Sequence, residues 1–380
     1  MPSGVERRLH AEPGPVKGRV SVLIPVYRGS DFLDDLLREL TRSDYEDKEI
    51  FVAVDEPDDR SLMVAAKYSG KVHFMLSQRR RGKVEALNSA VKASSGEILV
   101  FLDADVRIRG KGFLECIVDE MRDADILDFR KGIIHESFIS RMVNYEFIGA
   151  NLVSYLYSRL VGKCVGINGA AFAIRRRIFE EVGGFSRVIS EDFDLALKVL
   201  MKNGRFKYSE RLEAYTKAPS CWRSWISQRK RWGIGAGLWI RENWRRFLRC
   251  VASYPHIAVP SLIILFPTLI PLILNCVLVN APGYDVPNIL PSFITVQSSL
   301  WMPVAPGTAQ LLSKAFLALL ISFLPLAAVF YTASKKLRLH FRFHEFLLYF
   351  FIYQPISMLV LMGGIITAFL FENHKIDWKV

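Results

Sequence analysis

The chain has 380 residues, which is room for about two or three domains. Hydrophobic residues make up 51% and charged residues 23% of the chain, which excludes disorder throughout. Lys and Arg (50) outnumber Asp and Glu (38), and the net charge of +12 favours an anionic partner such as nucleic acid, a membrane surface or a phosphorylated substrate. The 5 cysteines are scattered and form no CxxC, which argues against a disulfide scaffold or a zinc–cysteine site.

The composition changes along the chain and predicts four parts. Residues 1–19 are polar and predict an N-terminal tether, whereas residues 20–220 alternate short apolar strands with helical stretches. Residues 221–250 are basic and rich in tryptophan. Residues 251–380 contain long apolar runs at about 257–279, 311–331 and 346–371. Because a membrane-spanning helix needs about 20 mostly apolar residues, these runs predict a transmembrane region of three helices.

The loops between these runs predict the orientation of the chain. Residues 281–310 contain no Lys or Arg, whereas residues 332–344 contain Lys335, Lys336, Arg338 and Arg342. By the positive-inside rule the second loop and the front domain lie in the cytoplasm, in a multi-pass protein of the cell membrane. The tail at 372–380 then lies outside, and its two lysines argue weakly against this orientation.

The front domain has the pattern of an α/β fold. The apolar runs predict strands at 19–26, 49–54, 72–76 and 97–102 and helices at 31–40 and 83–93. This alternation predicts a mostly parallel sheet with helices on both faces, in which ligands bind beyond the carboxyl ends of the strands. Those ends carry Pro25-Val26-Tyr27, Asp55 and Asp103-Ala104-Asp105.

The acidic residues at these strand ends need a cationic partner. Neighbouring carboxylates raise one another's pKa unless a cation or a hydrogen-bond donor offsets the charge. Mg²⁺ or Mn²⁺ with diphosphate oxygens would serve, since hard cations prefer carboxylate ligands. An Asp-x-Asp triplet alone is often a solvated turn, but here it directly follows an apolar strand. The sequence has no glycine-rich phosphate loop and no HExxH, so ATPase, dehydrogenase and zinc-hydrolase functions lack support.

Seven short motifs within 20–250 together resemble glycosyltransferase family 2, with its GT-A fold, and specifically its membrane-integrated, cellulose-synthase-like branch. The motifs are Pro25-Val26-Tyr27, Asp55, Gly82–Asn88 with Lys83, Asp103-Ala104-Asp105, Asn168–Arg175, the segment with Gly183-Gly184-Phe185 and Ser190-Glu191-Asp192, and the QxxRW motif Gln228–Trp232. The match departs from the family pattern at Glu56, which follows Asp55 and leaves the contact with the nucleobase open.

The resemblance implies a role for each matching residue. Asp192 is the expected catalytic base, with Asp194 as the nearest competitor, and Asp105 helped by Asp103 is the expected metal site. Glu191 and Trp232 are expected to contact the acceptor. The expected donor-binding residues are Pro25, Val26, Tyr27, Asp55, Lys83, Asp103, Asp105, Gln228, Arg231 and Trp232. A lone acid in the position of Asp192 could also be a helix-start residue favoured by the helix dipole.

The basic segment that contains QxxRW has two properties. Gln228, Arg231 and Trp232 lie at positions i, i+3 and i+4, so on a helix they share one face. Arg can bind a diphosphate bidentately, and Trp can stack on a sugar. The segment also has the composition of an amphipathic helix in the membrane interface, with basic residues at Arg223, Arg229, Lys230, Arg231, Arg241, Arg245, Arg246 and Arg249. Nucleic-acid binding is the rival class, but lipid explains a basic segment next to a spanning run more simply.

The resemblance implies an inverting, metal-dependent transferase that uses a nucleotide sugar. Its layout is similar to small archaeal-type mannosyltransferases of lipid-linked N-glycan assembly, which makes GDP-mannose the first donor to expect and a lipid-linked molecule at the cytoplasmic face the expected acceptor. No residue separates GDP from UDP. A processive polysaccharide synthase that uses a UDP-sugar is the alternative, although three spans are few to enclose a polar channel. A membrane-anchored nucleic-acid-binding protein is the non-enzyme alternative.

Overall fold

The computed structural model describes residues 18–109, 112–163, 165–257, 260 and 322–370. The chain divides into two compact units. Among the described residues, the first unit contains those within 18–131 and 157–216, and the second contains those within 132–156 and 217–370. The predicted tether at 1–19 lies almost wholly outside the described residues.

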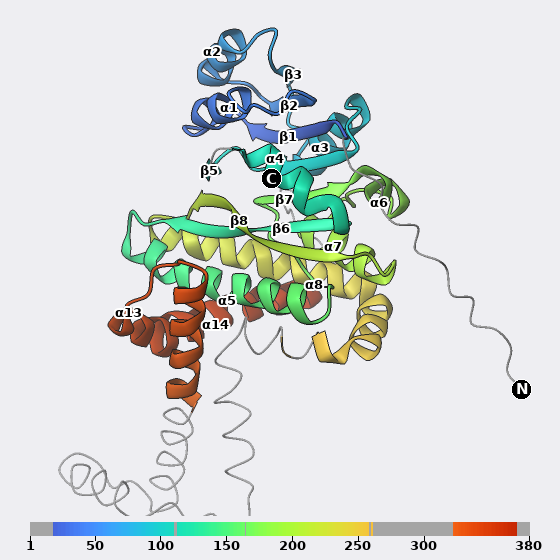
Figure 1. Cartoon of the computed structure of the whole chain (residues 1–380). Coiled ribbons are helices and arrows are strands. Elements are labelled where there is room, and N and C mark those ends of the chain that lie inside the picture. Colours follow the sequence, from blue (N-terminus) through green and yellow to red (C-terminus); the bar gives the residue numbers. More distant parts are fainter. Residues whose placement is uncertain (1–17, 110–111, 164, 258–259, 261–321, 371–380) are drawn as a thin grey trace, which may run out of the picture. The chain divides into compact units, whose positions relative to one another are not determined.

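One eight-stranded sheet organises the first unit (Figure 1). Its order is β3-β2-β1-β4-β7-β6-β8-β5. Strands β3, β2, β1 and β4 are mutually parallel, and β7 is antiparallel to both β4 and β6. The bounds are β1 (Val20–Tyr27), β2 (Lys48–Asp55), β3 (His73–Ser77), β4 (Ile98–Leu102), β5 (Arg107–Arg109), β6 (Ile126–Ile134), β7 (Ala171–Arg175) and β8 (Phe206–Lys217).

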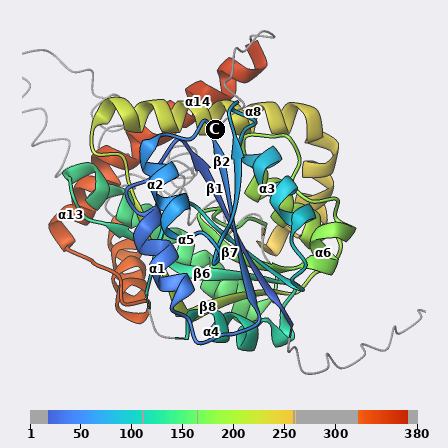
Figure 2. The same ribbon diagram turned by 90° about the horizontal axis from the view of Figure 1, so that it is seen from above.

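Helices cover the parallel part of the sheet on both sides, as the sequence predicts. Figure 2 shows α1 and α2 on one side of β1 and β2, and α3 and α6 on the other. The helices are α1 (Leu33–Thr41), α2 (Asp59–Lys67), α3 (Lys83–Ala93), α4 (Phe113–Glu120), α6 (Arg176–Glu181) and α7 (Glu191–Met201). The predicted GT-A-like fold class is confirmed, and α2 is an element that the sequence pattern did not reveal.

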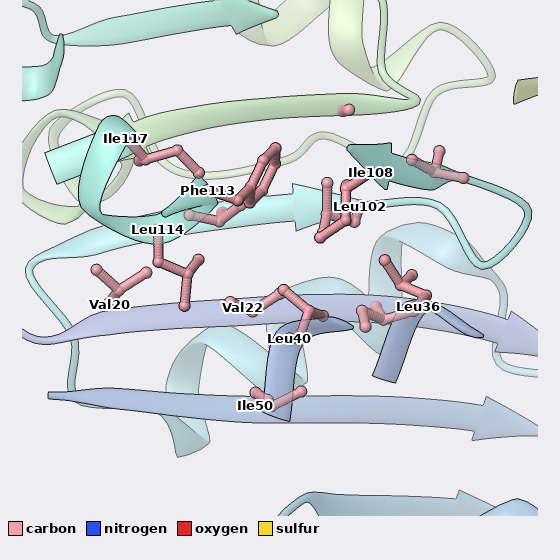
Figure 3. Close-up of a cluster of buried hydrophobic side chains, with 14 of the residues drawn as sticks. Val20, Val22, Leu36, Leu40, Ile50, Leu102, Ile108, Phe113, Leu114 and Ile117 are labelled. Atoms are coloured by element: carbon pink, nitrogen blue, oxygen red, sulfur yellow. The ribbon is translucent and has the colours of Figure 1, made fainter. Parts of the chain in front are cut away.

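The core of the first unit explains the apolar runs. Val20 and Val22 of β1 belong to one buried cluster together with Leu36 and Leu40 of α1 (Figure 3). Phe113 and Leu114 of α4 belong to the same cluster. A parallel strand is buried on both faces and so has a nearly continuous apolar sequence. Each large apolar side chain that is fully buried contributes about 1.5–3 kcal/mol.

The second unit is helical. It contains α5 (Phe138–Leu160, whose last turn belongs to the first unit), α8 (Trp222–Ser253), helical residues 322–336, α13 (Phe343–Leu348), the π-helical turn η2 (Tyr349–Tyr353) and α14 (Gln354–Leu370). Helices α8 and α14 approach each other closely at Gly364. A Cβ added to this glycine would lie only 2.7 Å from the carbonyl oxygen of Lys230. Asn243 interrupts α8 with non-helical dihedral angles.

One described helix, Phe343–Leu370, is long and apolar enough to cross a membrane. It contains the third predicted run, 346–371, except for its last residue. Several of its large apolar side chains are not covered by other parts of the protein. The exposed fraction is 73% for Leu359 and 52% for Ile366. The first predicted run, 257–279, lies outside the described residues apart from residues 257 and 260. Residues 311–321 of the second run also lie outside them, and residues 322–331 are helical.

Candidate active site

A narrow pocket in the first unit brings together five of the residues predicted from the sequence. Pro25, Lys83, Asp103, Glu191 and Asp192 line it. They come from β1, the start of α3, the residue after β4 and the start of α7. Apolar and aromatic side chains form the rest of the wall, and Gly169 contributes backbone. Pro25 and Asp103 thus line one pocket at the carboxyl ends of the parallel strands, where the sequence predicts a ligand site.

Lys83 joins the two acidic sides of this pocket. Its Nζ lies 2.9 Å from Oδ1 of Asp103 and 3.0 Å from Oε1 of Glu191. Burial lowers the pKa of Lys83, but the charges of the two carboxylates outweigh burial and the net pKa rises. Lys83 is therefore a cation at any pH at which the protein would work. Gly82 precedes it with φ of +94°, a conformation that favours glycine.

Asp103 and Asp105 have the chemistry of a divalent-cation site. Burial, and then the charge of Asp103, raise the pKa of Asp105 to about 6, against the influence of Lys83 and of a hydrogen bond with the side chain of Thr216. A bound cation would relieve the repulsion of the two carboxylates. Among the described residues, no group of three His, Cys, Asp or Glu side chains could hold a metal ion. If Mg²⁺ or Mn²⁺ binds here, Asp103 and Asp105 are the residues that would hold it.

Asp192 is held by backbone donors. The N–H of Gly169 donates to Oδ2 over 2.7 Å, and the N–H of Phe193 donates to Oδ1 over 2.8 Å. Burial, and then the charge of Glu191, nevertheless raise the pKa of Asp192 to about 6, against the influence of Lys83 and of the two N–H groups. A Cβ at residue 169 would lie 2.7 Å from Oδ2, so a larger residue there would displace the Asp192 carboxylate. The alternative base, Asp194, is buried and pairs with Lys198 instead of lining the pocket.

Asp55 is buried and fixes the backbone before α3. Its Oδ2 accepts the N–H groups of Arg81 and Gly82, each over 2.7 Å. Its Oδ1 accepts a hydrogen bond from the Nε–H group of Arg81 over 2.9 Å. The carboxylate therefore positions the residues that lead to Lys83. The sequence predicts that Asp55 contacts the nucleotide-sugar donor, and it does not reveal this supporting role. Hydrogen bonds from backbone N–H groups cannot be read from residue types.

The other residues of the first-strand motif differ in exposure. Val26 is 5% exposed and belongs to the apolar core, so it could meet a ligand only through its backbone. Tyr27 is 41% exposed, and its hydroxyl donates to Oε2 of Glu56 over 3.1 Å. The guanidinium of Arg80 lies 4.2 Å from the centre of the Tyr27 ring. Tyr27 thus presents an aromatic surface among cationic groups.

Gln228, Arg231 and Trp232 lie on α8, in the second unit. Trp232 is 40% exposed. Arg229, three residues before Trp232 on the same helix, is only 3% exposed. Its Nη2 donates to Oε2 of Glu146 over 2.5 Å, and its guanidinium lies 4.4 Å from the Trp232 ring centre. Glu146 is far away in the sequence, so no local pattern could have revealed this pair.

The comparisons with known proteins indicate a family for part of the chain. Residues 21–183 match the family model described as Glycosyl transferase family 2. The probable glycosyltransferase YdaM of Bacillus subtilis (strain 168) is 27% identical over 230 residues, which are 57% of this chain and 55% of that protein. The poly-β-1,6-N-acetyl-D-glucosamine synthase of Staphylococcus aureus (strain MSSA476) is 24% identical over 230 residues, 57% of this chain and 54% of that one. The chain thus spans about half the length of the curated relatives it matches.

A solved structure resembles the chain over nearly its whole length. The mannosyltransferase PcManGT from Pyrobaculum calidifontis, in complex with GDP-Man and Mn²⁺, superimposes with a TM-score of 0.53 at 18% identity. The alignment covers 95% of this chain and 90% of that one. At this identity the likeness concerns the fold alone. Residues 21–183 therefore match a glycosyl transferase family 2 domain, the fold is GT-A-like, and the predicted resemblance to this family is confirmed.

Proposed function

We propose that the protein is a membrane-bound, inverting, metal-dependent glycosyltransferase that moves mannose from GDP-mannose to a lipid-linked acceptor at the cytoplasmic membrane face. The observation that carries the proposal is the convergence of Lys83, Asp103, Glu191 and Asp192 in one pocket at the carboxyl ends of the parallel strands. The family 2 domain over 21–183 supports a sugar transferase. Mannose and GDP are the first donor to test because the structural neighbour was solved with GDP-Man.

The chemistry follows from charge and geometry. The acceptor oxygen forms a bond to the anomeric carbon of the sugar as the bond from that carbon to the diphosphate oxygen breaks. Asp192 accepts the proton of the acceptor hydroxyl, and a raised pKa near 6 matches a base that works near neutral pH. Direct displacement inverts the anomeric carbon, so an α-linked donor gives a β-linked product.

The negative charge that develops on the leaving diphosphate has to be offset. Asp103 and Asp105 would hold Mg²⁺ or Mn²⁺, and the bound metal supplies positive charge at the diphosphate. Pro25, Val26, Tyr27, Asp55 and Lys83 form the donor side in this proposal. On α8, Gln228 and Arg231 would bind the diphosphate. Trp232 would stack on a sugar, and Glu191 would face the acceptor.

A polysaccharide synthase that uses a UDP-sugar is the second candidate. The name of the Staphylococcus aureus relative, a poly-β-1,6-N-acetyl-D-glucosamine synthase, favours it. Against it, a growing polymer needs a shielded polar path through the membrane, and the sequence predicts three spans. Addition of one sugar to a lipid-linked acceptor needs no such path.

A donor screen with product analysis tests the proposal. The full chain, purified in detergent, would receive Mn²⁺, a polyprenyl-diphosphate-linked monosaccharide and either GDP-mannose, UDP-glucose or UDP-N-acetylglucosamine. Mass spectrometry should find one added mannose, and excess EDTA should abolish the product. A ladder of products from a UDP-sugar would establish the synthase instead. Absence of transfer from all three donors would reject the proposed donor and acceptor.

A further inference from the structure

Lys83 occupies the position in the pocket where positive charge is most needed. Four carboxylates lie in or beside this pocket, on Asp103, Asp105, Glu191 and Asp192. Among the residues that line it, Lys83 is the one basic side chain. Its ammonium group is within 3.0 Å of an oxygen on each of two carboxylates, one on Asp103 directly after β4 and one on Glu191 at the start of α7.

The same carboxylate of Asp103 is a ligand in the proposed metal site. A Mg²⁺ or Mn²⁺ ion binds a carboxylate oxygen at about 2.0–2.2 Å. If Lys83 Nζ stayed 2.9 Å from Oδ1 of Asp103 while the metal was bound, the ammonium group and the divalent cation would both contact the same carboxylate. Two cations that share one carboxylate repel each other, and this repulsion opposes their simultaneous binding. Lys83 contacts Oδ1 of Asp103, so a divalent cation on the same carboxylate would weaken that contact.

Glu191 offers Lys83 a second partner. Its side chain is 12% exposed, and its Oε1 already lies 3.0 Å from Nζ. Lys83 can therefore leave Asp103 without becoming an unpaired buried charge, which would be costly. Glu191 also begins α7, directly before Asp192. The lysine thus connects the metal side of the pocket with the helix that carries the proposed base.

We propose that Lys83 is an internal cation that competes with the divalent metal for Asp103 and is transferred to Glu191 alone when the metal binds. This inference rests on the metal site of the proposed function. It makes Lys83 a positioning residue on both sides of the pocket. Before the metal binds, the positive charge of Lys83 offsets the negative charge of Asp103. The metal has to displace Lys83 from Asp103, which weakens metal binding until the donor diphosphate also binds the metal.

Metal binding without nucleotide tests the transfer, independently of activity. The full chain in detergent would be titrated with Mn²⁺, and free Mn²⁺ would be measured by electron paramagnetic resonance. Lys83→Met should bind Mn²⁺ more tightly than the wild type, by roughly tenfold or about 1.4 kcal/mol. Lys83→Arg, which keeps the charge, should bind as the wild type does. Lys92→Met is the matched control, since it removes an exposed lysine from the same helix, and its affinity should not change.

A double-mutant cycle tests the part played by Glu191. Glu191→Gln should weaken Mn²⁺ binding, because Lys83 then has Asp103 as its one remaining carboxylate partner of the two. In the Lys83→Met background the same change should have a much smaller effect. Equal effects in both backgrounds would show that Glu191 acts on the metal directly and would overturn the transfer. If Lys83→Met does not fold, Lys83→Gln serves in the same cycle.

The outcomes separate this inference from the proposed function. If the wild type and Lys92→Met bind Mn²⁺ but Lys83→Met binds it no more tightly, the competition is rejected and the metal site stands. If no variant binds Mn²⁺ with or without GDP, the metal site of the proposed function fails, and the inference fails with it.

Discussion

At the level of single residues, Asp192 shows how burial and hydrogen bonding oppose each other. Two backbone N–H groups favour its charged form, yet burial and the neighbouring Glu191 outweigh them and raise its pKa to about 6. Such a carboxylate is fixed in place and is still basic enough to accept a proton. The backbone donors therefore serve its orientation more than its charge.

Replacing the base should affect turnover and leave donor binding intact. Asp192→Asn keeps the size of the side chain and removes its ability to accept a proton. Loss of a general base typically costs about 10²–10⁴-fold in rate. GDP affinity, measured by calorimetry with Mn²⁺, should stay within a few-fold of the wild type. Turnover close to that of the wild type would exclude Asp192 as the base.

The pH dependence of the reaction follows from the same group. The base has to be ionised, so turnover should rise with pH, pass half of its maximum at about pH 6 and level off above that. Lys83 lowers the pKa of Asp192 through its positive charge, so Lys83→Met should shift this limb to higher pH. A pH profile at saturating donor would check the direction. A shift to lower pH would contradict the assignment.

Sequence reasoning identified the members of the site better than their contacts. Asp103, Glu191 and Asp192 were all named, and the structure brings them into one pocket with Lys83. The salt bridge from Lys83 to Glu191 could not be predicted, because it depends on how two distant helices pack. The steric limit at residue 169 is likewise visible only in the contact with Asp192.

At the level of elements, the close approach of α8 and α14 provides a test with a built-in control. A Cβ at Gly364 would lie 2.7 Å from the Lys230 carbonyl oxygen and 3.0 Å from Cα of Gly233, whereas a Cβ at Gly363 would meet no atom within 4 Å. Ala is favoured over Gly inside a helix by about 1 kcal/mol. Gly363→Ala should therefore raise the melting temperature in detergent or leave it unchanged, and Gly364→Ala should lower it. Equal effects of the two changes would refute this packing.

The buried pair of Arg229 and Glu146 links α5 with α8. Trp225 and Tyr353 complete the network, since the indole N–H donates to the hydroxyl over 2.7 Å. Removing one member of a buried ion pair costs about 3–5 kcal/mol, whereas removing both charges is often neutral. Arg229→Met should therefore lower the melting temperature strongly, and Arg229→Met with Glu146→Gln should recover most of the loss.

The exposed Lys230 on the same helix supplies the comparison for this pair. Lys230→Met removes one positive charge without opening a buried pair, so stability should change by no more than about 0.5 kcal/mol. A double variant as unstable as Arg229→Met alone would show that the methionine is poorly packed and that the unpaired charge is not the cause.

The elements themselves were predicted unequally well. The strands at 19–26 and 97–102 were predicted because burial on both faces makes their sequences continuously apolar. Strands β6 and β8 contain charged residues that are paired inside the protein, such as Arg130 with Glu213, so their sequences do not indicate strands. The π-helical turn within 343–370 depends on tertiary packing and has no local signal.

At the level of the whole molecule, the membrane orientation remains a prediction that the loops define. Residues 332–344 hold four basic residues and residues 281–310 hold none, which places position 338 on the cytoplasmic side and position 288 outside. Arg338→Cys and Asn288→Cys would each be introduced into a chain whose five native cysteines are replaced by serine. In intact cells a membrane-impermeant maleimide should label Cys at 288 and label Cys at 338 only after permeabilisation. Labelling at 338 in intact cells would invert the orientation and move the nucleotide-sugar site to the wrong side of the membrane for a cytoplasmic donor.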